Sequence, residues 1–173
     1  MQKKPHAHIL DCTAGNRHIW GKDKMRDDVI FTDKEPNLRI APDLLCEWRD
    51  LPKHFPADYF HCAIFDPPFY SGQHGPFYRD VHCDPKEKAG SWWSIFSTKY
   101  SLRVELLKAQ QALAIISPRI CLKWCDTDEY QIDPILTLFT EFKPIFKQSW
   151  KNKSAVGKGV TWWVKLVRRG FTP

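Results

Sequence analysis

Residues 59–69 read YFHCAIFDPPF, a mostly apolar run that ends in an aspartate and two prolines. The apolar part is typical of a buried β-strand. Two successive prolines fix the backbone φ and hold the preceding residue extended, so the chain cannot continue there as a helix. The stretch therefore predicts a strand that presents its last four residues at the end of a sheet. These residues are Asp66, Pro67, Pro68 and Phe69.

The chain before this stretch has further apolar runs that stop at or just before acidic residues. Runs at 7–10 and 28–32 predict two strands, and a third is expected at 44–48. In an open parallel sheet, ligands bind beyond the carboxyl ends of the strands. We therefore expect a functional site at that edge. The acidic residues expected there are Asp11, Asp33, Asp50 and Asp66.

The chain after this stretch continues the alternation of helix and strand. Residues 100–116 and 130–142 have apolar residues at helical spacing, and strands are expected at 119–124, 145–150 and 160–167. Such alternation predicts an α/β protein with a largely parallel sheet and helices on both faces. A length of 173 residues fits a single domain, which we expect to span residues 1–173.

The first expected strand runs into DCTAG at residues 11–15, a turn that contains a glycine. A glycine there lets the backbone approach a ligand without a Cβ in the way. This turn resembles motif I of the class I S-adenosylmethionine-dependent methyltransferases, whose loop holds the methionine part of the cofactor. The family pattern has a second glycine where this chain has Arg17. The resemblance implies cofactor contacts from Asp11, Thr13, Ala14, Gly15, Arg17 and His18.

The resemblance also implies roles for acidic residues further along. In this cofactor class, an acidic residue at the end of the second strand accepts hydrogen bonds from both ribose hydroxyls, which suits Asp33, with Glu35 as its competitor. Asp50 resembles the position that contacts the adenine amino group, although an aspartate before Leu-Pro is equally typical of a turn. Arg17 and His18 are expected near the cofactor carboxylate, for which a cation is a good partner.

The tetrad at residues 66–69 resembles motif IV of the amino-methyltransferases, which act on adenine N6, cytosine N4 and some guanine N2 atoms. The Asp66 carboxylate and the Pro67 carbonyl can accept the two N–H bonds of an exocyclic amine, and Phe69 can stack on the base. The resemblance covers about 7–167 and implies the Rossmann-like class I methyltransferase fold. That fold has a mostly parallel seven-stranded sheet with an antiparallel last strand.

A closer resemblance connects the chain with small methyltransferases of phages and bacteria. It lies in the string GNRHIW at 15–20, in the Asp-Pro-Pro step, in the pair Lys123-Trp124 at the end of a strand, and in a late Lys-x-x-x-Trp segment. This resemblance implies that Arg17 and His18 of this chain belong to a family variant of the cofactor loop.

Charge is distributed unevenly along the chain, which has a formal net charge of +6 and no acidic residue after Glu141. This basic end fits either a phosphate-rich partner or a solvated basic face. A loop insertion at about 70–97 is rich in aromatic residues, which suit stacking on single-stranded or flipped bases but can equally pack beneath the loop. Candidate substrate-binding residues are Tyr70, Trp92, Trp93, Lys151 and Lys153.

These features favour an S-adenosyl-L-methionine-dependent enzyme that methylates an exocyclic amine of a nucleic-acid base, with adenine N6 in DNA or RNA first. Two alternatives stay open: a methyltransferase for a small molecule or protein amide, and a non-catalytic binding protein or partner subunit with the cofactor fold. A protein partner or a homodimer would suit the last of these. No C-x-x-C pair is present, so we expect no metal site. The absence of a long apolar run and of a signal peptide predicts a cytoplasmic protein without membrane contact.

Overall fold

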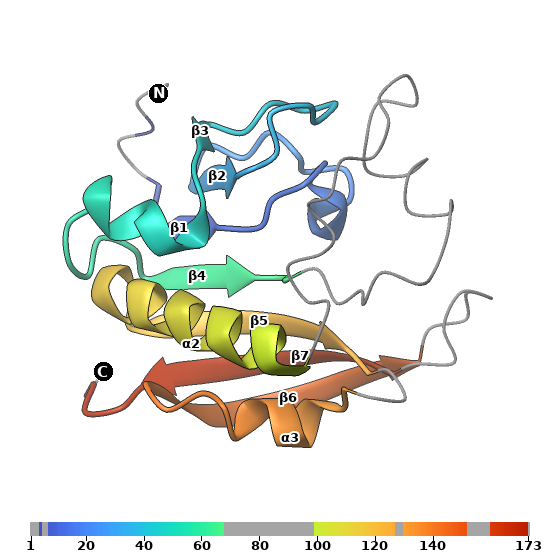
Figure 1. Ribbon diagram of the computed structural model, residues 1–173. Helices are drawn as coiled ribbons and strands as arrows, with labels where there is room; N and C mark the ends of the chain where they lie inside the picture. The colour runs from blue at the N-terminus through green and yellow to red at the C-terminus, as the bar shows by residue number, and fades with distance from the viewer. Residues whose placement is uncertain (1–3, 5–6, 68–98, 127–129, 152–159, 173) are drawn as a thin grey trace.

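The computed structural model, which describes residues 4, 7–67, 99–126, 130–151 and 160–172, has a seven-stranded sheet at its centre (Figure 1). The strand order is β3-β2-β1-β4-β5-β7-β6. Neighbouring strands are parallel from β3 to β5, whereas β7 is antiparallel to both β5 and β6. The mostly parallel sheet with an antiparallel last strand, expected of the Rossmann-like class I methyltransferase fold, is confirmed. The strands are β1 (Ile9–Asp11), β2 (Val29–Asp33), β3 (Leu44–Leu45), β4 (Cys62–Phe65), β5 (Arg119–Cys125), β6 (Phe142–Lys151) and β7 (Val160–Arg168).

The strand order reverses at β1, which pairs with β2 on one side and with β4 on the other. The connection from β1 leads outward to β2 and β3, and the chain then returns to β4 and continues to β5. At such a switch point the two connections diverge and leave a crevice beyond the carboxyl ends of the strands. The fold therefore brings the ends of β1 and β4 together at the position where this class of sheet binds ligands.

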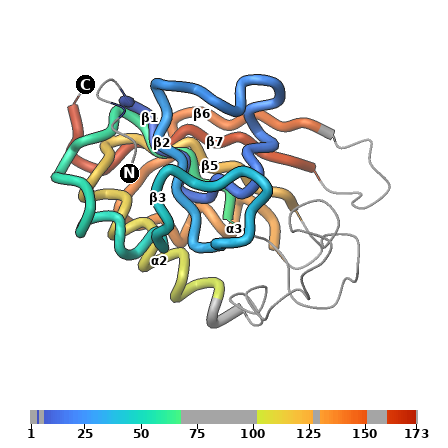
Figure 2. The backbone as a smooth tube through the Cα atoms, turned by 90° about the horizontal axis from the view of Figure 1, so that it is seen from above, coloured from blue at the N-terminus to red at the C-terminus, as the bar shows by residue number. Residues whose placement is uncertain are grey.

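One face of the sheet carries the main core. The helix α2 (Lys99–Ile116) and the 3-10 helix η2 (Trp48–Lys53) pack against each other, and α3 (Ile132–Leu136) lies on the same face (Figure 2). Burial of apolar side chains from both the helices and the sheet is the main force that holds this layer in place. The largest fully buried side chains in this core include Phe60, Phe65, Leu106, Leu113, Trp124 and Phe139.

The described residues cover the opposite face less. The connection from β1 to β2 crosses it and contains the short 3-10 helix η1 (His18–Trp20), whose Trp20 ring packs edge-on against Phe31 at 5.7 Å between ring centroids. Figure 2 shows this connection on the side of the sheet away from α2. Helical residues thus lie on both faces, as expected, but very unequally among the described residues. The connection from β1 to β2 contains only this single helical turn.

Two expected elements are much shorter than the sequence predicts. The strand expected at 44–48 stops at Leu45, and residues 48–53 form η2 instead. The reason is the spacing of Trp48 and Leu51, which are three residues apart and bury their side chains on one side of this helix. The helix expected at 130–142 is only Ile132–Leu136. Gln110 in α2 binds the chain beyond it, donating to the carbonyl of Leu138 and accepting from the N–H of Glu141, and β6 begins directly afterwards.

Among the described residues, none of the helices has the length and apolarity that crossing a membrane requires.

Candidate active site

Three carboxylates gather at the carboxyl edge of the sheet, around the switch point. Asp11 and Asp33 are the last residues of β1 and β2, and Asp66 directly follows β4. Because these strands are parallel, their ends meet at one edge. The expected grouping is confirmed for these three residues. Asp50 is an exception, because β3 ends five residues before it and Asp50 lies in η2.

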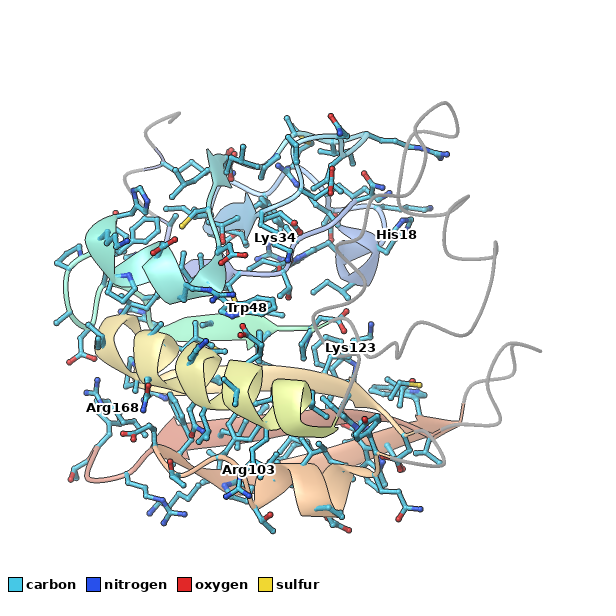
Figure 3. All side chains as sticks on the ribbon, viewed as in Figure 1. His18, Lys34, Trp48, Arg103, Lys123 and Arg168 are labelled. Carbon is cyan, nitrogen blue, oxygen red and sulfur yellow. The ribbon has the colours of Figure 1, made fainter. Side chains whose placement is uncertain are left out.

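Asp66 is tied to the rest of this edge by two short hydrogen bonds. Its backbone N–H donates to Oγ1 of Thr13 (2.7 Å), and its Oδ2 accepts from the Lys123 ammonium (2.6 Å). Lys123 reaches this position from β5, the neighbouring strand; Figure 3 shows it where β4 ends. Burial raises the pKa of the Asp66 carboxyl above its ordinary value, and the charge and hydrogen bond of Lys123 oppose this rise. The side chains of Asp66 and Lys123 are only 18% and 28% exposed, so water screens their ion pair weakly.

Asp11 is fully buried and is held by two donors. The indole N–H of Trp20 donates to Oδ2 (2.7 Å), and the backbone N–H of Thr13 donates to Oδ1 (3.3 Å). Burial raises the pKa of Asp11 to about 7, although both donors lower it; Asp66 and Asp33 add to the rise. A carboxyl of this kind is poised to change its charge when a cation arrives nearby.

The loop after β1 is shaped by hydrogen bonds to β2. The N–H of Ala14 donates to the carbonyl of Thr32 (3.1 Å), and the N–H of Gly15 donates to Oδ2 of Asp33 (2.8 Å). Gly15 has a φ of +48°, a conformation that glycine adopts without strain, and a Cβ built on it would meet no atom of the described residues within 4 Å. The loop therefore presents open space beside the glycine, as the sequence pattern predicts.

Asp33 links this loop to the segment after β2. Its Oδ1 accepts from the N–H of Glu35 (2.9 Å) while its Oδ2 accepts from Gly15. Burial raises the pKa of Asp33, and the N–H groups of Glu35, Gly15 and Lys34 oppose that rise. Asp33, which is partly exposed, thus lies next to the loop, as a ribose-binding residue must.

Arg17 stabilises the loop through contacts of its buried side chain. It adopts the left-handed conformation with φ 58°, its residue is only 2% exposed, and its guanidinium lies 3.8 Å from the centre of the Phe31 ring. Its Nη1 donates to the carbonyl of Lys24 (2.7 Å) and its Nη2 to that of Ala41 (2.8 Å). A contact between Arg17 and a cofactor carboxylate stays a prediction. The exposed His18 lies on the side toward which β4 points (Figure 3).

Asp50 forms an ion pair with Lys53 (2.7 Å) and lines a surface cleft of about 350 Å³. The cleft begins beside the end of β2, since Lys34 lines it and the N–H of Cys46 donates to the carbonyl of Asp33. A contact between Asp50 and adenine stays a prediction. Asp50 and Lys34 line the same cleft, and Lys34 directly follows Asp33, the residue expected to bind the ribose. The remaining residues that line the cleft are Leu45, Cys46, Glu47 and His54.

Several expected site residues lie outside the described residues. For Lys151 the structure describes the backbone at the end of β6 but not the side chain. Pro67 is described and buried. The residues outside are Pro68, Phe69, Tyr70, Trp92, Trp93 and Lys153, together with the whole insertion at 70–97.

Two residues of this edge were not assigned a role from the sequence. In the sequence, Lys123 is one of a pair that ends a strand. The alternation along β5 is a usable signal for its role, because Lys123 shares a sheet face with Asp66. Trp20 donates to Asp11, which lies nine residues earlier, and no simple periodicity predicts this hydrogen bond.

Comparison with known proteins assigns the chain to no family. No protein-family model matches the chain, and no curated protein matches it. Among solved structures, it is similar to the N-methyltransferase NodS from Bradyrhizobium japonicum WM9, with a TM-score of 0.49 and 8% identity, over 92% of this chain and 83% of that one. A similarity at this level supports no conclusion by itself, so the fold assignment rests on the strand order and directions described above.

Proposed function

We propose that this chain is an S-adenosylmethionine-dependent methyltransferase that acts on an exocyclic amine of a nucleic-acid base, with adenine N6 first. The observation that carries the proposal is the bond from the Asp66 N–H to Oγ1 of Thr13. It joins the loop resembling motif I to the first residue of the tetrad resembling motif IV. A transfer reaction needs donor and acceptor sites in direct contact, because positioning supplies much of the rate.

The residues of this edge suit the proposed cofactor. The open space at Gly15 leaves room for a ligand against the backbone, and the Asp33 carboxylate can accept hydrogen bonds from ribose hydroxyls. The cofactor carries a positive sulfonium, and the edge supplies the carboxylates of Asp11 and Asp33. When bound, the cofactor supplies an electrophilic methyl group.

The chain's own residues would position and activate the amine. Oδ2 of Asp66 already accepts from Lys123, whereas Oδ1 has no hydrogen-bond partner within the described part of the chain. Oδ1 can therefore accept one N–H of the amine, and the Pro67 carbonyl can accept the other. Both acceptors raise electron density on the nitrogen and hold its lone pair in one direction. Lys123 supports this role by favouring the ionised form of Asp66.

The choice of a nucleic-acid base rests on two supports. The tetrad resembles that of enzymes acting on such bases, and the chain is basic, with no acidic residue after Glu141. A phosphate-rich substrate is attracted to such a surface through release of counterions. A small molecule or protein amide would give no reason for this charge distribution.

The test is transfer of tritiated methyl from the cofactor to DNA, tRNA and rRNA, followed by nucleoside analysis of whatever is labelled. We expect N6-methyladenosine or its deoxy form. Label in another nucleoside would correct the base, and label only in small molecules or protein would overturn the nucleic-acid part. Label in nothing, together with no cofactor binding by calorimetry, would leave the non-catalytic binding protein.

The matched control compares two aspartates. Asp66→Ala should bind the cofactor like the wild type but transfer no methyl group, because the amine loses its charged acceptor. Asp133→Ala changes a carboxylate that is 73% exposed on α3, and its turnover should be unchanged. Equal turnover in Asp66→Ala and wild type would remove Asp66 from the mechanism.

A further inference from the structure

The face of the sheet away from α2 carries a regular array of side chains across β5, β7 and β6. The register aligns the three strands into rows, because Cys121 pairs with Lys165, which pairs with Phe146. Side chains at paired positions project to the same face of a sheet. Two further rows run parallel to this one toward the carboxyl end of β5. They are Lys123–Trp163–Gln148 and Cys125–Thr161–Trp150.

The middle row ends at the candidate active site. Lys123 is the first member of that row, and its ammonium binds Asp66. Neighbouring strands are about 4.8 Å apart, so Gln148 on the outer strand lies about 14 Å from Asp66 across the sheet. A polymer lying along this row would therefore reach the site within two or three nucleotides.

This face is partly exposed along these strands, although Thr161 in the third row is buried. On β5 every second residue is buried in the core on the α2 side, while Cys121, Lys123 and Cys125 are only partly buried. On the outer strand, Phe146 is 48% exposed and Trp150 is 56% exposed. Both rings lie on the edge strand of the sheet and forgo the favourable free energy of burial. Exposed aromatic residues of this kind mark interaction surfaces.

The rows of the array contain two basic residues and no acidic residue. Lys123 is paired with Asp66, whereas the exposed Lys165 ammonium lies 5.2 Å from the centre of the Phe146 ring. Aromatic rings interleaved with cations on an open sheet are the pattern by which proteins stack bases and neutralise the backbone of single strands.

We infer that this face, formed by the three rows on β5, β7 and β6, is a platform that binds single-stranded nucleic acid. The inference that the platform leads a strand to Asp66 for methylation rests on the proposed function, whereas the inference that it binds a single strand does not. A second copy of the chain fits the face less well, because a two-fold interface places the same patch on both sides and would oppose Lys165 to basic residues of the same array.

The experiment measures binding in the absence of cofactor. Fluorescence anisotropy follows a labelled single strand of about 15 nucleotides, DNA and RNA separately, across a range of salt concentrations. Trp150→Ala and Phe146→Ala should each weaken binding by about fivefold or more, the effect of losing one stacked base. Lys165→Gln should weaken binding. It should also reduce the slope of log affinity against log salt by about one, the contribution of a single neutralised phosphate.

Matched controls come from the other face of the same hairpin and from the other end of the sheet. Lys147 also lies over an aromatic ring, at 4.7 Å from Trp162, but on the α3 side, where it pairs with Asp133. Lys147→Gln should leave affinity unchanged. Tyr59, which is 38% exposed before β4, supplies the aromatic control, and Tyr59→Ala should also bind normally. Thermal unfolding of every variant checks that the fold is intact.

The outcomes separate this inference from the proposed function. Binding that falls in the platform variants and not in the controls supports the platform, even if no methyl transfer is found. Methyl transfer with binding that is equal in all variants overturns the platform and leaves the proposed function. A wild-type chain that binds no single strand also overturns it. So does a dimer in sedimentation that dissociates in Trp150→Ala, because the face would then belong to a second copy.

Discussion

The Lys123 ammonium lies 2.6 Å from Oδ2 of Asp66, and this ion pair connects β5 to the residue proposed to hold the amine. An ionised carboxylate accepts an N–H much more strongly than a neutral carboxyl does, and burial at this edge works against ionisation. Lys123 therefore has a positioning role, because it maintains the charge of Asp66 without contacting the reacting atoms.

Replacing Lys123 should change the pH dependence of methyl transfer. The pKa of Asp66 is raised by burial and lowered by Lys123, so Lys123→Met should raise it further and move the acidic limb of kcat to higher pH. Lys123→Arg retains the charge and should restore most of the wild-type profile. The measurement is kcat against pH for the three proteins. An acidic limb at the same pH in Lys123→Met would show that the ion pair is only structural.

Removing the Asp33 carboxylate should weaken cofactor binding by about tenfold or more, because hydrogen bonds to a charged group are each worth about 1.5–3 kcal/mol. Isothermal titration calorimetry of Asp33→Ala measures this directly. Glu35→Ala tests the competitor for the ribose, and Asp133→Ala again serves as the exposed control. If Glu35→Ala loses affinity and Asp33→Ala does not, the ribose role passes to Glu35.

Cofactor binding should release a proton near neutral pH. Asp11 has a pKa of about 7 in the folded chain, so it is partly protonated there, and a cation close to it favours its ionised form. Calorimetry in buffers of different ionisation enthalpy counts the released protons. The release should vanish above about pH 9, where Asp11 is already ionised.

S-adenosylhomocysteine is the matched ligand for this measurement, because it lacks the sulfonium charge. It should bind with a smaller proton release than S-adenosylmethionine. The Asp11→Asn variant should show no difference between the two ligands. An equal release from both ligands in the wild type would mean that the sulfonium does not lie near Asp11.

The sequence predicts the architecture well because each strand that forms the edge carries its own local signal. The apolar run before Asp66 and the prolines after it determine where β4 ends, and the runs before Asp11 and Asp33 do the same for β1 and β2. Such signals are local, and tertiary contacts do not override them here. β3 and α3 are shorter than expected because their limits depend on distant partners, as when Gln110 binds the chain beyond α3.

The parts of the site that could not be predicted are those that depend on pairing across the sheet. The bond of Lys123 to Asp66 requires the register of β4 with β5, and the rows of the platform require that of β7 with both its neighbours. Alternation within one strand gives the face of a side chain but not its partner on the next strand. The sequence therefore predicts which carboxylates meet at the edge but not which cation accompanies them.

Arg17 provides a test of how the variant loop is stabilised, since it has φ 58° where the family pattern has glycine. The left-handed conformation costs a non-glycine residue roughly 1–2 kcal/mol, and the guanidinium offsets this cost by binding the carbonyls of Lys24 and Ala41 and by stacking on Phe31. Arg17→Ala keeps the strain and loses the contacts, so it should lower the free energy of unfolding by about 3 kcal/mol.

Arg17→Gly loses the same contacts but relieves the strain, so it should be about 1 kcal/mol more stable than Arg17→Ala, although glycine normally destabilises a chain relative to alanine. Urea unfolding followed by tryptophan fluorescence measures both variants. Arg103→Ala, an exposed position on α2, should change stability by no more than about 0.5 kcal/mol. If Arg17→Gly is less stable than Arg17→Ala, the loop does not hold Arg17 in the left-handed conformation. If neither variant is destabilised, the guanidinium does not stabilise the loop and is available to bind the cofactor carboxylate.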